Sequence, residues 1–285
     1  MGLVPIVGQR RGSQNQCIGQ EPRYIQYRWQ DRNFSFADRF GAEPVYAASA
    51  LYLQLSEVTL MPRSFGAYGK MPALGDFFRI ELPAAFVGPF DEWIQRWMVQ
   101  VKGDFGPNWN EVYNSAPIWR FGLAGGLAGP SPVIGVMMNS VDRVGRQFPL
   151  VLAAQLEEGE CPVFAHLSGT ALFETLECVA LDALEDTMSR EVLKERLSAL
   201  NWEIPVVSRR NCKMAENGWR LSGRATNIRD MLAARFLKSQ YPEVSVWSAR
   251  VSETEYMVCH TGMPEASDMK AFLDIGWIGS EVPEE

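Results

Sequence analysis

Apolar residues recur every three or four positions over several long stretches of the chain, which is the spacing of one buried helical face. The longest stretch covers 86–105, where Pro89 suits a first-turn position and Gly106 suits the helix end. We interpret its tryptophans and phenylalanines as a core that packs on a sheet, rather than as a groove for a partner. Similar spacing predicts helices over 167–184, 190–200, 226–237 and 264–273.

Short apolar or alternating runs bounded by glycine and proline predict strands. These runs cover 118–123, 133–138 and 148–156, followed by a hairpin over 244–251 and 256–260. The strands follow one another in hairpin-like runs and do not alternate regularly with helices. We therefore expect an α+β fold, with a largely antiparallel or mixed central sheet flanked by helices on its faces.

The segment before Met61 differs from the rest of the chain. Residues 1–62 are polar and dotted with arginine, and only 45–60 has the composition of a short helix. Our hypothesis is that 1–62 is a poorly ordered extension or an upstream read-through, with the true translation start at Met61. We predict a single domain over 63–278, followed by an acidic tail over 279–285.

The balance of charge limits the classes of partner. The 285 residues include 27 basic and 34 acidic side chains, a net charge of −7, and there is no run rich in lysine or arginine. Such a surface repels nucleic acid and anionic lipid, so neither is an expected partner. No stretch approaches the roughly 18 consecutive apolar residues of a membrane span, and the amino terminus does not predict a secretory signal. We expect a soluble, cytoplasmic protein with no membrane insertion.

The cysteines and histidines do not predict a metal centre. Five cysteines lie far apart with no Cys-x-x-Cys spacing, which favours small core residues in a reduced compartment over disulfides or zinc. His166 and His260 have no evident ligand or triad partner nearby in the sequence. There is also no Gly-x-Ser-x-Gly motif and no cofactor fingerprint. We therefore expect no catalytic residues, no metal and no cofactor.

Two segments set ionisable residues among glycines, prolines and aromatics, which is the composition of tightly built loops at strand ends. Residues 65–77 read Phe-Gly-Ala-Tyr-Gly-Lys-Met-Pro-Ala-Leu-Gly-Asp-Phe, and residues 140–149 read Ser-Val-Asp-Arg-Val-Gly-Arg-Gln-Phe-Pro. Function usually lies in such loops. Their charged side chains are therefore candidates for one converging polar site.

These segments resemble motifs of the TagF/ImpM family, accessory proteins of the bacterial type VI secretion system. Positions 69–77 match the family's Gly-Lys-x-Pro-x-x-Gly-Asp-Phe, and 116–121 match Ala-Pro-x-Trp-Arg-Phe. Positions 139–149 match Pro-Ser-x-Asp-x-x-Gly-Arg-x-Phe-Pro, except that Asn139 stands where the family usually has proline. This departure questions the rigidity of that turn.

The resemblance implies a cytoplasmic accessory factor without enzymatic activity. Such a factor is expected to act after translation as a negative regulator of type VI secretion. It would do so by binding the forkhead-associated scaffold protein of the apparatus and withholding it from assembly. A contact of about 800 Å² on each partner is enough for this role.

We predict that the partner surface forms on the loops 66–79 and 139–149. The residues predicted for partner binding are Lys70, Asp76, Phe77, Trp119, Arg120, Asp142, Arg143 and Arg146. We expect Lys70, Asp76 and the two loop arginines on its rim, with Phe77 and Trp119 supporting it from below. On a turn, the spacing of Arg143 and Arg146 lets both guanidiniums face one carboxylate or phosphate.

Alternatives stay open at this point. One alternative is a small hydrolase of phosphorylated or acylated substrates, with Asp142 and the nearby arginines at its centre. Asp142 and Asp76 would then be its acid and base, provided that burial separated the pKa values of the two carboxyl groups. Another alternative is that the chain is a permanent structural subunit of the secretion machine. Within the loops, each aspartate would instead have a structural role if it accepted hydrogen bonds from loop amides and paired with an arginine.

Overall fold

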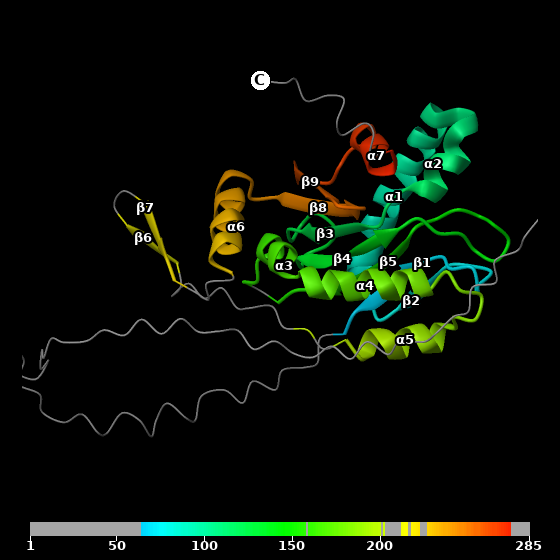
Figure 1. Ribbon diagram of the computed structural model, residues 1–285, viewed down its shortest axis with the longest axis horizontal. Coiled ribbons are helices and arrows are strands. Elements are labelled where there is room, and N and C mark those ends of the chain that lie inside the picture. Colours follow the sequence, from blue (N-terminus) through cyan, green and yellow to red (C-terminus); the bar gives the residue numbers. More distant parts are fainter. Residues whose placement is uncertain are drawn as a thin grey trace, which may run out of the picture. The chain divides into compact units, whose positions relative to one another are not determined.

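The computed structural model describes residues 64–157, 159–200, 202, 212–215, 218–222 and 227–274 (Figure 1). Contacts divide the chain into Met1–Thr59 and Leu60–Glu285, and every described residue belongs to the second unit. The predicted extension over 1–62, its short helix over 45–60 and the acidic tail over 279–285 lie outside the described residues. The domain limits 63–278 remain a prediction.

The described residues form an α+β fold, as the sequence predicts. The strands are β1 (Gly66–Gly69), β2 (Phe78–Ile80), β3 (Trp119–Leu123), β4 (Val133–Met138), β5 (Leu150–Gln155), β6 (Cys212–Ala215), β7 (Gly218–Leu221), β8 (Val244–Val251) and β9 (Thr254–Thr261). The helices are α1 (Ala84–Phe105), α2 (Trp109–Ser115), α3 (Pro162–Ser168), α4 (Thr170–Asp182), α5 (Arg190–Ser198), α6 (Ile228–Gln240) and α7 (Ala266–Leu273), with a 3-10 turn η1 (Gly106–Asn108) before α2.

One large antiparallel sheet organises these elements. Its strand order is β2-β1-β5-β4-β3-β8-β9, and every neighbouring pair is antiparallel. Strands β6 and β7 form a separate two-stranded hairpin. The prediction of a largely antiparallel central sheet is therefore confirmed.

Helix α1 buries its apolar stripe against one face of the sheet (Figure 1). Phe90 packs on Phe121 of β3 and Trp93 packs on Trp247 of β8, with ring centroids 5.5 Å apart in each pair. Helices α2 and α7 contribute to the same apolar layer. The interpretation of the stripe as core is confirmed. Pro89 lies in the second turn and not in the first, because the helix already begins at Ala84.

Helices α4 and α5 cover the opposite face with a second apolar layer (Figure 1). Phe173 and Leu176 of α4 are buried there together with Ile134 of β4 and Leu152 of β5. Both faces of the central strands are therefore covered. This is why β4 and β5 are almost continuous apolar runs in the sequence, without the alternation of a half-exposed strand; β3 interrupts its apolar run with the buried Arg120.

The structure differs from the sequence prediction in several short elements. The pattern does not predict β1, β2 or α2, because four, three and seven residues are too few for a period to show. The helix predicted over 167–184 is two helices, α3 and α4, since the chain leaves the helical path at Gly169. The β8–β9 turn is shorter than predicted, with Ser252 at φ 55°.

The prediction that most cysteines are core residues is wrong for those that the structure describes. Cys178 and Cys259 are exposed, and Cys161 is half-buried. Cys178 lies on the outer side of α4, whose buried side is already filled by larger apolar residues. Cys17 and the side chain of Cys212 lie outside the described residues.

The register of three strands places both motif loops at the same end of the sheet. Strand β5 lies between β1 and β4 and runs antiparallel to both. The chain therefore leaves β1 at Gly69 and β4 at Met138 beside Leu150, the first residue of β5. The loops 70–77 and 139–149 begin at these points.

Candidate functional site

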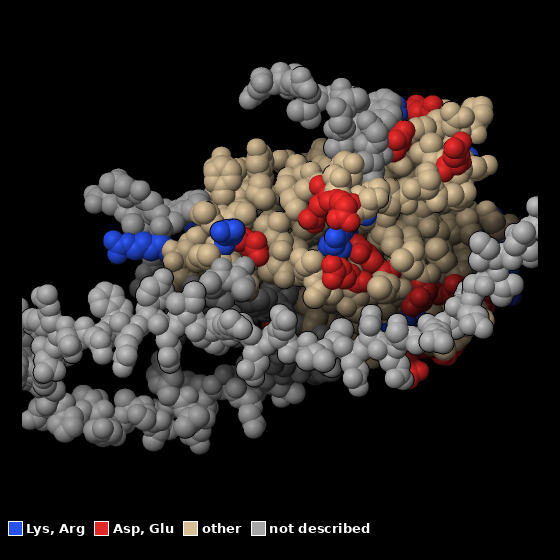
Figure 2. All heavy atoms as spheres, in the orientation of Figure 1, with Lys and Arg blue, Asp and Glu red and all other residues tan. Residues whose placement is uncertain are grey.

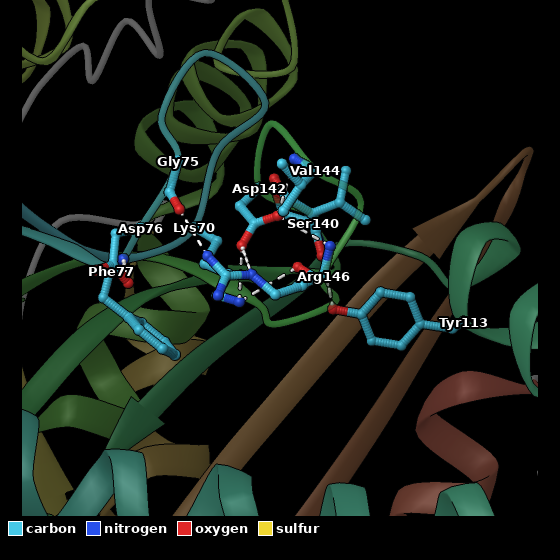
Figure 3. A network of polar contacts seen from close by, with 10 residues as sticks. Lys70, Gly75, Asp76, Phe77, Tyr113, Ser140, Asp142, Val144 and Arg146 are labelled. Atoms are coloured by element: carbon cyan, nitrogen blue, oxygen red, sulfur yellow. Dashed lines mark hydrogen bonds and ion pairs between the residues drawn. The ribbon is translucent and has the colours of Figure 1, made fainter.

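The two motif loops lie side by side and are joined by hydrogen bonds (Figure 3). We call residues 70–77 the first loop and residues 139–149 the second loop. The N–H of Arg143 donates to the C=O of Leu74 at 2.8 Å. Nη2 of Arg146 donates to the C=O of Gly75 at 2.6 Å. The fold thus brings together two segments that are far apart in the sequence.

The carboxylate of Asp142 is the centre of this contact (Figure 3). Its Oδ1 accepts hydrogen bonds from the N–H groups of Val144 at 3.1 Å and Arg146 at 2.9 Å. Its Oδ2 accepts one from Nε of Arg146 at 2.6 Å and forms an ion pair with Nζ of Lys70 at 3.0 Å. The Asp142 side chain is 0 % exposed, so these donors take the place of water around the charge.

These donors keep Asp142 ionised. Burial by itself raises the pKa of the Asp142 carboxyl. The N–H of Arg146, the ammonium of Lys70 and the guanidinium of Arg146 outweigh that effect, and they hold the pKa well below its usual range. Such a carboxyl has no proton to donate near neutral pH, and its lone pairs are already used. The arrangement favours an anchoring role for Asp142 over acid–base chemistry.

Lys70 joins the two loops from beneath their surface. Its side chain is 7 % exposed, and Nζ donates to the C=O of Arg146 at 3.4 Å in addition to its ion pair with Asp142. Nζ also lies 4.8 Å from the ring centre of Phe77, which is a cation–π distance. The prediction that Lys70 lies on the rim is therefore wrong, because its buried partners replace solvent. Asp142 is equally inaccessible to a partner.

Helix α2 holds the second loop from its other side. The hydroxyl of Tyr113 donates to the C=O of Ser140 at 3.0 Å and accepts from the N–H of Ser140 at 3.3 Å. Nε1 of Trp109 donates to Oε1 of Gln147 at 2.6 Å. Nδ2 of Asn139 donates to the C=O of Tyr113 at 2.8 Å. Asn139 thus ties the turn to α2 by a side-chain hydrogen bond.

Two glycines with positive φ shape these loops, one at a close approach and one in a tight turn. Gly69 has φ 127°, and a Cβ at this position would lie 2.0 Å from the C=O of Pro149. Gly145 has φ 81°, and its N–H closes a turn by donating to the C=O of Asp142 at 2.8 Å. Both backbone conformations favour glycine over other residues.

The outer side of the loops exposes a mixture of apolar and charged groups. Val144, at the turn, is 72 % exposed and Phe77 is 46 % exposed. Asp76, Arg143 and Arg146 are also exposed. We call these five residues the loop surface. The sequence analysis missed Val144. An apolar side chain within a tight polar turn is the feature that indicates such an exposed position.

Phe77 belongs to this surface, whereas the sequence analysis places it beneath. Its ring rests edge-on against buried Phe148, with centroids 4.7 Å apart, and lies beside Tyr68 at 6.1 Å. Phe77 therefore has one side packed on the core and one side open to a partner.

Trp119 and Arg120 lie elsewhere, and the prediction that they belong to the partner surface is wrong. They are neighbours on β3, so their side chains point to opposite faces of the sheet. Nε1 of Trp119 donates to the C=O of Phe272 at 2.8 Å in the α1 layer. Arg120 forms an ion pair with Glu177 of α4 at 2.6 Å in the other layer. Both residues are buried.

A buried histidine–serine pair joins α3 to β8, and the two residues are too far apart in the sequence for the pair to be recognised there. A ring nitrogen of His166, Nε2, lies 2.9 Å from the hydroxyl of Ser248. Burial and the nearby guanidinium of Arg120 lower the pKa of His166 to about 3, so the imidazole is neutral. Because both residues are buried, we interpret the pair as packing rather than as a reactive dyad.

Other features of the described residues add no second site. No group of His, Cys, Asp and Glu side chains among them is arranged to hold a metal ion. None of the helices in this part of the chain is both long and apolar enough to cross a bilayer. A groove of about 460 Å³ lies between α1 and the segment entering α7, with Trp93, Trp97 and Pro264 in its lining.

Comparisons with known proteins connect this geometry to a family. The sequence profile of the TagF N-terminal domain, described as type VI secretion system-associated, matches residues 66–200, which include both loops. The crystal structure of PA0076 from Pseudomonas aeruginosa PAO1 is similar, with 30 % sequence identity and a TM-score of 0.64. The similarity covers 78 % of this chain and 98 % of that chain. This chain belongs to the TagF family. No curated protein sequence matched it.

The TagF match places the chain among type VI secretion system-associated proteins. It ends at residue 200, before β8 and β9. Trp247 of β8 nevertheless packs on Trp93 and Phe121, with ring centroids 5.5 and 5.3 Å away. The core of this TagF-family chain therefore includes residues beyond the matched segment.

Proposed function

We propose that this TagF-family chain is a cytoplasmic, non-enzymatic accessory protein of the type VI secretion system. It acts as a negative regulator after translation by binding the forkhead-associated scaffold protein of the apparatus and withholding it from assembly. Family membership supports the association with type VI secretion. The observation that carries the docking role is the loop surface, where exposed Val144 stands on a rigid turn between Arg143 and Arg146.

Rigidity makes this surface suitable for binding. The turn is fixed from within by Asp142, from one side by the first loop and from the other by Tyr113 of α2. Little conformational entropy is then lost when a partner binds, so more of the contact energy appears as affinity. Arginine and large aromatic side chains are also enriched among residues that dominate binding energy.

The same network argues against the hydrolase alternative. A hydrolase with two carboxyl groups needs one as acid and one as base, with separated pKa values and access to substrate. Asp142 is enclosed by its donors, and its low pKa leaves it without a proton to give. Asp76 accepts the N–H of Phe77 at 2.8 Å on the exposed side. These contacts support a structural role for the two aspartates over catalysis.

Co-purification tests the proposal in a secreting strain. Tagged full-length chain should retain the forkhead-associated scaffold protein, and cells without the chain should release more effector. Arg143→Glu and Val144→Asp should each reduce the retained scaffold by about 10-fold and raise effector release. Both changes affect exposed side chains, so thermal unfolding should be nearly unaltered.

The matched controls lie on the exposed side of α1. Arg96→Glu and Val99→Asp make the same chemical changes at an exposed arginine and at a valine that is 78 % exposed. They should leave scaffold retention unchanged. Equal retention by loop-surface variants and controls would reject the docking site. Stoichiometric presence of the chain in purified apparatus would favour a structural subunit over a regulator.

A further inference from the structure

Strand β9 is the last strand at one end of the sheet. It pairs with β8 along eight residues, and no other strand in the described part of the chain pairs with it. The strand at the opposite edge, β2, has three residues. A long free edge is the feature of a sheet that accepts a strand from another chain.

The register shows which backbone groups of β9 face away from β8. Hydrogen-bonded pairs alternate with non-bonded pairs along an antiparallel ladder. Just beyond the strands, the N–H of Gly262 donates to the C=O of Glu243 at 2.8 Å. The even-numbered residues of β9 therefore exchange hydrogen bonds with β8. The outward N–H and C=O groups belong to Glu255, Met257, Cys259 and Thr261.

The side chains of β9 do not protect this edge. Protected edge strands commonly carry lysine, proline or a bulge. Strand β9 reads Thr-Glu-Tyr-Met-Val-Cys-His-Thr and pairs with β8 in continuous register. Tyr256 and Val258 pack toward the α1 layer, whereas Met257 and Cys259 are exposed on the opposite face. An added strand would continue this partly apolar surface.

Acidic side chains gather beside the edge, over α4 and the β8–β9 hairpin (Figure 2). They include Glu174, Glu177 and Glu255, whose charges all act on the guanidinium of Arg120. Arg120 and Arg250 each pair with one glutamate of this cluster, at 2.6 and 3.7 Å. The cluster therefore keeps a net negative charge, which favours a positively charged partner.

We propose that β9 is a docking edge for an extended, basic strand of a partner protein. The outward backbone groups of β9 supply the main-chain hydrogen bonds, and the neighbouring glutamates select lysine or arginine side chains. A second copy of this chain fits less well, because pairing two β9 edges brings two acidic clusters together. The edge is separate from the loop surface, since β3 and β8 lie between β9 and β4, the strand from which the second loop begins.

Peptide titration combined with hydrogen exchange tests the proposal on the full chain. The probe is a labelled peptide of alternating valine and lysine, matched to the eight residues of β9, and its twin carries glutamate for lysine. We expect the lysine peptide to bind at least about 10-fold more tightly. The amides of Met257 and Cys259 should exchange quickly in the free chain and about 10-fold or more slowly with the lysine peptide.

A pair of substitutions at one position separates backbone pairing from side-chain contact. Met257→Pro removes an outward N–H and leaves the β8 ladder intact, since proline fits edge strands at such positions. Met257→Thr removes the same side chain and keeps the N–H. The lysine peptide should bind about 10-fold more weakly to the proline variant and within about threefold of normal to the threonine variant. Circular dichroism checks that both variants fold.

Several results would overturn the proposal. These are equal binding of the two peptides, equal effects of the proline and threonine variants, and outward amides already protected in the free chain. If the proline variant does not fold, Glu255→Lys replaces it and should abolish the preference for the lysine peptide; an unchanged preference counts against the proposal. A dimer of the unmodified chain that pairs through β9 assigns the edge to a second copy instead.

Discussion

Lys70 and Asp142 are opposite charges removed from water beneath the loop surface, and each is costly to bury without the other. The cost is offset here because the Asp142 carboxylate accepts from two backbone N–H groups, one guanidinium and one ammonium. At the scale of single residues, this one acid therefore fixes the turn that presents Val144. Its ionisation is part of the stability of the folded loops.

Asp142→Asn should destabilise the protein and change its pH dependence. The pKa of folded Asp142 lies below that of an unfolded aspartate, about 4. As the pH falls, the unfolded chain binds this proton first, so the contribution is complete above about pH 4 and is lost below it. The variant should melt roughly 5 °C or more lower at pH 7. Its stability should also depend less on pH below about 4.

Urea unfolding between pH 2 and 7 measures both effects. Asp76→Asn is the matched control, because Asp76 is an exposed acid of the neighbouring loop. It should change the free energy of unfolding by less than about 0.5 kcal/mol. Equal pH profiles for Asp142→Asn and the unmodified protein would show that Asp142 is not the anchor.

At the scale of elements, the junction of β1 with the second loop depends on Gly69. Gly69→Ala places a Cβ 2.0 Å from the C=O of Pro149 at φ 127°, so it should lower the free energy of unfolding by about 3 kcal/mol or more. Gly126→Ala is the control for backbone strain alone, because φ is 99° there and the Cβ meets open space. It should cost about 1–2 kcal/mol. Equal costs in chemical denaturation would mean that the close approach to Pro149 is unimportant.

The contact between α2 and the second loop gives a separate prediction. Tyr113→Phe leaves the buried N–H of Ser140 without its partner and removes one of the two hydrogen bonds to the C=O of Ser140, which also accepts from the N–H of Phe148; the change should cost about 1–3 kcal/mol. Hydrogen exchange should show faster opening of the second loop than in the unmodified protein. Tyr241→Phe at an exposed tyrosine is the control and should be nearly neutral. If hydrogen exchange of the second loop is unchanged in Tyr113→Phe, α2 does not contribute to the rigidity of that loop.

The sequence predicts elements whose pattern is long enough to read. Helix α1 is recognised from its repeated aromatic positions, and β3, β4 and β5 from short apolar or alternating runs between glycines and prolines. Strand β1 contains two glycines in four residues, so no alternation identifies it. It becomes a strand because β5 and β2 pair with its two edges. That is a property of the assembled sheet.

The candidate site is predicted only in part for the same reason. The motifs point to both loops, and the sheet order then brings Lys70 within reach of Arg146, although 76 positions separate them in the chain. Which charges are buried depends on this long-range packing, so Lys70 is misplaced in the sequence analysis. Arg120 is misplaced because its motif lies on a strand whose two faces lead to different layers.

At the scale of the whole molecule, two candidate docking regions differ in charge. The chain has a net charge of −7, yet the loop surface carries Arg143 and Arg146, whereas the β9 edge adjoins an acidic cluster. The two proposed surfaces therefore suit partners of opposite charge, and strands β3 and β8 separate them.

Salt should affect the scaffold complex through the two arginines of the loop surface. Exposed charges are screened as ionic strength rises, so the scaffold complex should weaken and its association rate should fall. Raising the salt from about 50 to 500 mM should increase the Kd several-fold for the unmodified chain and much less for Arg143→Glu. Binding of the chain to immobilised scaffold protein, followed over a series of salt concentrations, measures the Kd and the association rate. A salt response that is the same in both would place the electrostatic contact elsewhere.

The most direct measurement is the Kd of the purified chain for the forkhead-associated scaffold protein, determined by calorimetry for two double variants. We predict that Arg143→Glu with Val144→Asp weakens binding by about 30-fold or more, while Arg96→Glu with Val99→Asp on α1 stays within about twofold of the unmodified chain. Equal affinity of the two double variants would contradict the claim that the loop surface is the docking face.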